Sequence, residues 1–314
     1  MLEYLQTRVG AGAPGQLLIL DEPEAHVHPS LQRALVAQLT TSQNQTIATS
    51  HSPYVATAAG IARTILFSSS ADGNQTATNL GFEIPQEAVS TLDRILDSTR
   101  GELLFATRLL LVEGVSEALL VPALLRSVGI DIASQHISIV PVGGTFHDQL
   151  TLLFKSGALG YRCAVLCDGD NFRVDGKLAA CYDAGKNILA SAAPINGLQY
   201  FSNNTTFEYT LVQPETIATM RTLLAATTFR DAKKLFDEFP PVPLQPDLAV
   251  AQLEALKVAT RMGKGMFAQT FANSLGSATF CPAYILDSVK WLISYTIEKP
   301  SPRRPQSIAS SPPR

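Results

Sequence analysis

The sequence predicts an α/β protein, in which a parallel sheet flanked by helices follows a smaller α/β lobe and precedes a helical segment. Two observations carry this prediction. Between residues 103 and 166, apolar runs of strand length alternate with stretches of helical period, as in a βαβ sheet. The chain has 314 residues, of which 46% are hydrophobic and 16% charged, so it can bury a substantial core, and we expect two domains.

Residues 1–70 form the first expected unit. Its strands are short apolar runs, and Pro29 favours the start of its helix. The expected elements cover residues 17–20, 30–39, 45–49 and 63–67. The polar run over residues 68–79 predicts a loop, so a boundary is expected near residue 70.

Residues 71–102 are expected to connect the two lobes, and residues 103–299 to form the larger domain. Val89, Leu92 and Ile95 at helical spacing predict a connecting helix. Strands are expected at residues 109–113, 137–142 and 163–167, and helices at 86–97, 116–127, 146–154, 215–225, 231–238, 248–260 and 283–297. The end, residues 300–314, is rich in Pro, Ser and Arg and predicts a disordered tail.

Acidic residues end two of the apolar runs. Glu113 closes the run LLLVE, and Asp168 and Asp170 follow the run CAVLC. The carboxyl ends of parallel strands meet at one edge of a sheet, where open α/β folds gather their ligands. Carboxylate oxygens are the ligands that Mg²⁺ prefers. The sequence therefore outlines a divalent-metal site.

A further acid, Glu117, stands four residues after Glu113 at an expected helix start, so both would project from one face of its first turn. Asp168 and Asp170 are two apart in an extended segment, which places both on one side. Four acids could bracket two ions about 3.5 to 4 Å apart, the arrangement that activates water in phosphodiester cleavage. The alternative for either pair alone is a solvated turn or helix face.

The order of these motifs resembles a Toprim domain, the fold of topoisomerases, primases and certain nucleases. EGxxE is followed by an apolar strand with a glycine pair, residues 139–144, and then by a strand that ends in DxD. The resemblance covers about a third of the chain. A topoisomerase or primase would also need a strand-passing tyrosine domain or a polymerising site, and the sequence supplies neither.

Upstream, QLLILDEPEAHVHPSLQ followed by TIATSHSP resembles the last part of an ABC-type ATPase head. The resemblance implies that Asp21 holds the water shell of Mg²⁺, that Glu22 polarises the attacking water and that His51 is the switch histidine. The alternative is a core strand with a turn and a loop histidine. His26 and His28 could be metal ligands, but the resemblance implies a structural turn for them.

The sequence contains neither a GxxxxGK[ST] phosphate loop nor an LSGG-type signature. We therefore expect that this chain does not hydrolyse ATP by itself, and that it uses ATP only if the missing half of the ATPase is supplied. A truncated reading frame, an excised fragment and one half of a split pair all agree with this pattern.

An ABC-type ATPase head followed directly by a Toprim domain resembles the OLD family, named for overcoming lysogenization defect, whose members resemble nucleases. The TLE-like segment of the family is matched by TTFEYTL, which contains Glu208. Its KGxFAxxLA-like helix is matched by residues 263–272, which contain Lys264. Some members place a second acid after the TLE glutamate, where Tyr209 and Thr210 stand here.

The resemblance implies a DNA endonuclease that uses two Mg²⁺ or Mn²⁺ ions, with water as the nucleophile. The expected metal ligands are Glu113, Glu117, Asp168, Asp170 and Glu208. Glu113, Asp168 and Asp170 are also the expected catalytic carboxylates. Lys264 would offset charge on the scissile phosphate, although a solvated lysine at a helix start is the alternative.

DNA is the expected partner, and family members associate through their ATPase lobes, so a homodimer or an ATPase partner is also expected. The competing interpretation is a catalytically silent regulatory or sensor subunit that docks on an ATPase partner and binds metal for structure. Metal-dependent cleavage by the isolated chain would separate these two functions.

Composition limits the remaining classes. The net charge of −3 gives no indication of nucleic-acid affinity, because phosphate binding normally shows as a basic face. No apolar run reaches about 18 residues and the start lacks a secretory pattern, so we expect a cytoplasmic protein that does not enter membranes. Cysteines without CxxC spacing predict reduced core residues. They are Cys163, Cys167, Cys181 and Cys281.

Overall fold

A computed structural model describes most of both lobes. The described residues are 17–42, 44–69, 75–96, 100–143, 152–154, 159–168, 172–174, 177–179, 197–203, 206–213, 216, 262–275 and 280–294. The expected helices at residues 231–238 and 248–260, the expected tail, Asp170 and Cys181 lie outside these residues, as do the expected helices at 146–154 and 215–225 apart from residues 152–154 and 216.

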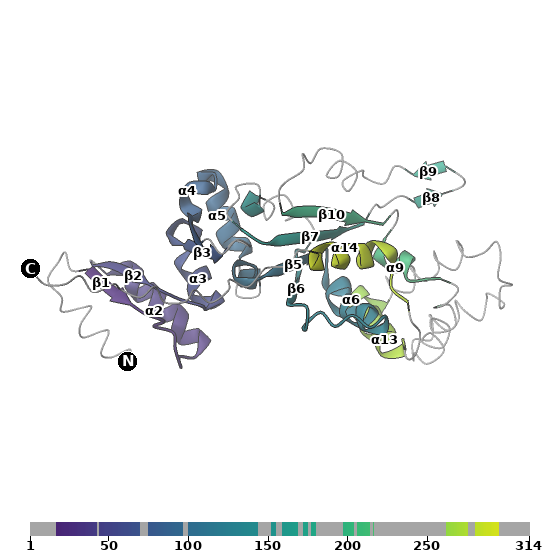
Figure 1. Ribbon diagram of the computed structural model, residues 1–314, viewed down its shortest axis with the longest axis horizontal. Helices are drawn as coiled ribbons and strands as arrows, with labels where there is room; N and C mark the ends of the chain where they lie inside the picture. Colours follow the sequence, from purple (N-terminus) through teal and green to yellow (C-terminus); the bar gives the residue numbers. More distant parts are fainter. Residues whose placement is uncertain are drawn as a thin grey trace, which may run out of the picture.

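The larger lobe is built on a four-stranded parallel sheet with the order β10-β7-β5-β6 (Figure 1). The strands are β5 (Arg108–Val112), β6 (Ile137–Pro141), β7 (Arg162–Cys167) and β10 (Leu198–Ser202). Central β5 pairs with β6 from Arg108 opposite Ile137, and with β7 from Arg108 opposite Arg162. The predicted parallel sheet is therefore confirmed, and its strands end at a common edge.

Successive side chains of β5 point to opposite faces of the sheet, as in any β-strand. Leu110 and Val112 belong to one buried cluster, while Leu109 and Leu111 belong to another. All four side chains are fully buried. A strand covered on both faces reads as a continuous apolar run, which explains the sequence LLLV.

Helices cover both faces of this sheet. The first face packs against α6 (Val115–Ser127), α9 (Phe207–Thr210), α13 (Lys264–Ser274) and α14 (Ala283–Ile293). The second face packs against α5 (Gln86–Ile95), α4 (Leu80–Glu83) and the short helices η1 (Ile61–Arg63) and η2 (Arg100–Phe105). The expected connecting helix thus becomes part of the core of the second face.

The smaller lobe holds a parallel pair, β1 (Leu17–Leu20) with β2 (Gln45–Ala48), beside the helices α2 (Pro29–Thr41) and α3 (Pro53–Ala59). His28 is the N-cap of α2, and its side chain accepts a hydrogen bond from the backbone N–H of Ser30. Ser52 caps α3 in the same way. The structural role expected for His28 agrees with this cap.

One prediction in the connecting region is wrong. Residues 75–79 were expected in a loop, but they form β4 (Gln75–Asn79), which pairs antiparallel with β3 (Ile65–Ser69). Their Thr side chains suit an exposed strand, which needs hydrogen bonds to its partner strand but no apolar face. A second short hairpin consists of β8 (Phe172–Val174) and β9 (Lys177–Ala179).

None of the helices among the described residues is long and apolar enough to span a membrane. The three described cysteines, Cys163, Cys167 and Cys281, are buried free thiols, as expected. Burial raises the pKa of the Cys281 thiol to about 12, which keeps it protonated and unreactive.

Packing of α6 against the first face can be tested with two leucines of the same helix. Leu124 is fully buried, whereas Leu119 is 39% exposed. Leu124→Ala should lower the free energy of unfolding by about 3 kcal/mol, because it removes a side chain from a closed core. Leu119→Ala should cost less than about 1 kcal/mol, because water already reaches that side chain. Urea unfolding measures both, and equal losses would contradict the packing described here.

Candidate active site

The carboxyl edge of the sheet brings together two of the expected acids. Glu113 directly follows β5, and Asp168 directly follows the neighbouring strand β7. The backbone N–H of Asp168 donates a hydrogen bond of 2.7 Å to Oε1 of Glu113. The two residues, which are 55 positions apart in the sequence, are therefore in direct contact.

Two further groups orient the carboxylate of Asp168, which is only 8% exposed. The side-chain Nδ2 of Asn203 donates to Oδ1 over 2.7 Å. The backbone N–H of Phe207 donates to Oδ2 over 3.0 Å. Each carboxylate oxygen of Asp168 thus has a fixed donor, which restricts the plane of the group.

Burial, and after it the negative charge of the neighbouring Glu113, raise the pKa of Asp168 to about 8. The hydrogen bonds from Asn203 and Phe207 oppose this shift without cancelling it. An ionised Asp168 is therefore costly at this edge unless positive charge is nearby.

Glu117 lies in the first turn of α6 and is 7% exposed. Its Oε2 accepts a hydrogen bond of 3.0 Å from the backbone N–H of Gly114. Burial raises its pKa, and the negative charges of Glu208 and Glu113 act in the same direction, while Lys264 acts against them. Glu117 is thus within electrostatic range of both acids.

Glu208 and Lys264 form an ion pair at the same edge, with 3.3 Å between Oε1 and Nζ. The side chain of Glu208 is fully buried, and that of Lys264 is 55% exposed. Within the described part of the chain, neither carboxylate oxygen of Glu208 accepts a hydrogen bond. The Lys264 side chain therefore extends from its ion pair with the buried Glu208 to the solvent.

Burial by itself lowers the pKa of Lys264, but the carboxylates of Glu208, Asp168 and Glu117 outweigh it and the net pKa is raised. The ammonium group consequently stays charged. A permanent cation beside several carboxylates is suited to receive a phosphate oxygen.

The donor set fits a hard divalent cation in charge and in type. Four carboxylates lie at this edge, with Lys264 as the cation among them: Glu113, Glu117, Asp168 and Glu208. Two features of this edge are penalties that a cation would relieve: the raised pKa of Asp168, and the buried Oε2 of Glu208, which has no hydrogen-bond partner among the described residues. Over the described ranges, however, no group of three His, Cys, Asp or Glu side chains is arranged to hold a metal ion, and Asp170 lies outside them.

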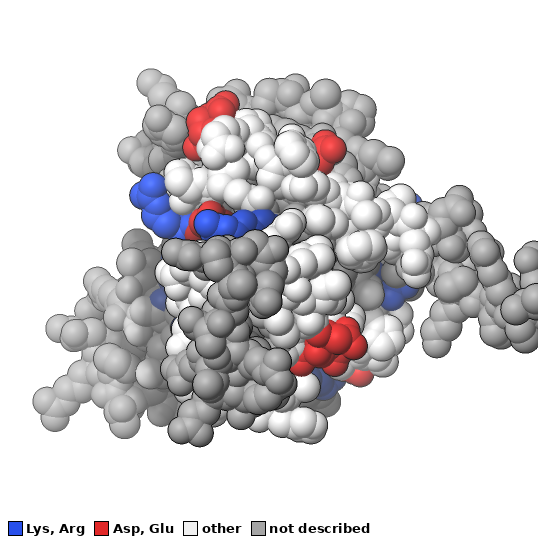
Figure 2. Space-filling view, turned by 90° about the vertical axis from the view of Figure 1, so that its left-hand side faces the viewer, with Lys and Arg blue, Asp and Glu red and all other residues white. Residues whose placement is uncertain are grey.

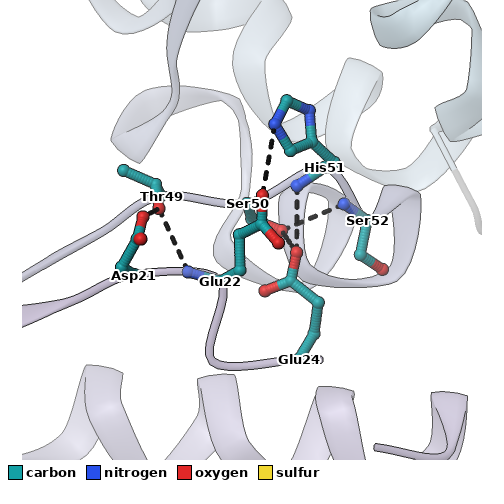
Figure 3. Close-up of polar contacts among 7 residues, drawn as sticks. All are labelled: Asp21, Glu22, Glu24, Thr49, Ser50, His51 and Ser52. Carbon is teal, nitrogen blue, oxygen red and sulfur yellow. Dashed lines mark hydrogen bonds and ion pairs between the residues drawn. The ribbon is translucent and has the colours of Figure 1, made fainter. Parts of the chain in front are cut away.

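The acids of the smaller lobe form a separate polar cluster (Figure 3). Asp21 accepts a hydrogen bond of 2.5 Å from the hydroxyl of Thr49, and the backbone N–H of Glu22 donates to the same hydroxyl over 3.1 Å. Oε1 of Glu22 lies 3.5 Å from Nε2 of His51. The structure thus brings Asp21, Glu22 and His51 together, as the motif order implied.

Glu24 was not expected in this cluster. Its Oε1 accepts hydrogen bonds from the hydroxyl of Ser50, over 2.6 Å, and from the backbone N–H of His51, over 2.9 Å (Figure 3). These bonds fasten the turn after β1 to the loop that carries His51. Glu22 has a positive φ of 42°, which is uncommon for a residue with a side chain and marks a constrained turn.

Asn203 and Tyr284 were also missed at the larger site. The Tyr284 hydroxyl is hydrogen-bonded to the side chains of Asn203 and Thr210. Asn203 directly follows β10, a strand that was not predicted from the sequence, so the strand-end rule that identified Glu113 could not be applied to it. Tyr284 lies 81 residues further along in α14, and its sequence gave no signal of a role here.

Comparison with known proteins gave two family matches. Residues 104–170 match the model of the overcoming lysogenization defect protein-like Toprim domain, a segment that includes Glu113, Glu117, Asp168 and Asp170. Residues 6–57 match the model of an AAA domain described as putative AbiEii toxin, type IV TA system. The expected resemblance to OLD proteins, an ATPase-like segment followed by an OLD-like Toprim segment, is thereby confirmed.

Solved structures similar to this chain include the C-terminal region of the Burkholderia pseudomallei OLD protein, with 26% identity over 60% of this chain and 98% of that chain and a TM-score of 0.48. The C-terminal region of the Xanthomonas campestris pv. campestris OLD protein is 26% identical over 62% of this chain and 95% of that chain, with a TM-score of 0.44. No curated protein matched.

The ion pair between Lys264 and Glu208 predicts a pattern of stabilities in metal-free buffer. Lys264→Met should lower the free energy of unfolding by about 2 kcal/mol, because it leaves a buried carboxylate without its cation. The double variant Glu208→Gln with Lys264→Met should regain most of this loss, since position 208 then carries no charge that needs a cation. Urea unfolding with EDTA measures both.

The matched control is Lys290→Met. Lys290 is 70% exposed and pairs with exposed Asp287 at 3.7 Å, so its loss should change stability by less than about 0.5 kcal/mol. If the single variant Lys264→Met and the double variant lost the same free energy of unfolding, the loss would not come from the unpaired carboxylate of Glu208.

Proposed function

We propose that this chain is a metal-dependent DNA endonuclease of the OLD type, which hydrolyses phosphodiester bonds at the carboxyl edge of the larger sheet. The observation that carries the proposal is the direct contact of Glu113 with Asp168. Both residues fall within the segment that matches the OLD-like Toprim domain. Lys264, the first residue of α13, pairs with Glu208 and lies within electrostatic range of Asp168.

In this proposal two Mg²⁺ or Mn²⁺ ions use the ligands Glu113, Glu117, Asp168, Asp170 and Glu208. Bound ions would supply the positive charge that makes water a better nucleophile and the phosphate a better electrophile. Asn203 and the backbone N–H of Phe207 hold the carboxylate of Asp168 in one orientation. Burial of these groups limits competing water at the acids.

Lys264 has the role of a phosphate-binding cation. Its side chain is half-exposed, so a phosphate oxygen can approach it from solvent while Glu208 holds it from the protein side. Charge that builds on the phosphate during hydrolysis would then be offset by a group that is already in place. Glu208 therefore also positions Lys264.

The same proposal assigns residues 1–70 to a partial ABC-type ATPase lobe, 71–102 to a connection, 103–299 to the nuclease domain and 300–314 to a tail. Asp21, Glu22 and His51 would act on ATP only together with a phosphate loop supplied from elsewhere. A homodimer or an ATPase partner could supply it.

One observation favours the alternative of a regulatory subunit that docks on an ATPase partner. Three apolar side chains of the β1–β2 pair are strongly exposed: Leu17 by 54%, Ile19 by 70% and Ile47 by 53%. The end of the molecule where this pair lies has broad areas without charged side chains among its described residues (Figure 2). Exposed apolar area of this kind is typical of an interface.

Plasmid cleavage distinguishes the two functions. The parent chain with Mg²⁺ or Mn²⁺ should convert supercoiled plasmid to nicked or linear DNA. Asp168→Asn should abolish this activity, and Lys264→Met should slow it by about 100-fold, because each removes charge that the reaction needs. Lys290→Met should cut at the parent rate. A folded parent that is inactive with both metals would instead support the regulatory subunit.

A further inference from the structure

Helix α14 is held at its C-terminal end by two arginines from the start of the sheet strands. Arg162, the first residue of β7, donates to the carbonyl of Trp291 over 2.6 Å and to the hydroxyl of Ser294 over 3.0 Å. Arg108, the first residue of β5, donates to the carbonyl of Leu292 over 3.2 Å. These bonds fix the helix against one end of the sheet.

At its other end, α14 reaches the opposite edge of the same sheet, where Asp168 follows β7 (Figure 1). Tyr284, in the first turn of α14, is partly buried there, and its hydroxyl is hydrogen-bonded to the side chains of Asn203 and Thr210. Asn203 in turn donates to Asp168 over 2.7 Å. A continuous chain of contacts therefore leads from α14 to the carboxylate.

The orientation of the Asn203 amide matters because its two ends are not equivalent. The nitrogen end donates to the carboxylate, whereas a reversed amide would place a carbonyl oxygen against it. A second hydrogen bond, between the same amide and the hydroxyl of Tyr284, restricts the rotation of the amide. Loss of the hydroxyl would release the amide without removing any group that touches Asp168.

We propose that Tyr284 is a positioning residue, which sets the carboxylate of Asp168 for a divalent cation by fixing the amide of Asn203. The inference rests on the proposed function, because it assumes that Asp168 is a metal ligand. Groups that orient a ligand in this way commonly change metal affinity or activity by about 10- to 100-fold when they are altered.

The test compares two partly buried tyrosines. Tyr161 packs against the second core, and its hydroxyl donates to the carbonyl of Leu103, so Tyr161→Phe also removes one buried hydroxyl. Mn²⁺ affinity by electron paramagnetic resonance, thermal stability in EDTA, and kcat and KM for plasmid cleavage are measured for the parent, Tyr284→Phe and Tyr161→Phe.

We expect Tyr284→Phe to weaken Mn²⁺ binding and lower kcat by about tenfold each, with KM for DNA changed by less than about twofold. Tyr161→Phe should lower thermal stability about as much as Tyr284→Phe does, but should keep the Mn²⁺ affinity and kcat of the parent. Asn203→Ser, which keeps the ring and hydroxyl of Tyr284 but removes the amide, should weaken Mn²⁺ binding at least as much as Tyr284→Phe does.

Parent-like Mn²⁺ affinity in Tyr284→Phe and Asn203→Ser would overturn the proposal. Equal losses of Mn²⁺ affinity in the two tyrosine variants would also overturn it, because they would indicate a general effect on stability. If the parent binds Mn²⁺ but cuts no DNA, the endonuclease proposal fails, while the affinities still decide the role of Tyr284. A parent that binds no Mn²⁺ contradicts both.

Discussion

The hydrogen bond between the backbone of Asp168 and the carboxylate of Glu113 is the contact on which the arrangement of the larger site depends. It joins the ends of two adjacent parallel strands that are buried on both faces, so neither end can shift without disturbing a core. The contact also concentrates negative charge, which Glu117 and Glu208 increase. A protein tolerates such crowding where a cation offsets it.

Much of this site follows from the sequence because it obeys a local rule. A buried strand that ends in an acid delivers that acid to the sheet edge, and Glu113 and Asp168 are both found there. Lys264 could be identified only by its resemblance to a family helix, since a lysine at a helix start has no distinctive local pattern. Its ion pair with Glu208 joins segments 56 residues apart in the sequence.

The parts that the sequence did not predict depend on long-range packing. Tyr284 reaches Asn203 because α14 is fixed across the sheet by Arg108 and Arg162, and no periodicity encodes that placement. Strand β4 was missed because an exposed two-stranded hairpin needs no apolar alternation. In the smaller lobe, Glu24 accepts a hydrogen bond from the backbone of His51, which lies 27 residues further along the sequence.

The central claim is that the carboxylates at this sheet edge hold a divalent cation. The most direct test is an anomalous-difference map from crystals of the chain soaked in Mn²⁺. The account predicts a peak at coordination distance from carboxylate oxygens of Glu113 and Asp168, and its loss in Asp168→Asn crystals. A map in which Mn²⁺ binds elsewhere while this edge stays empty would contradict the account.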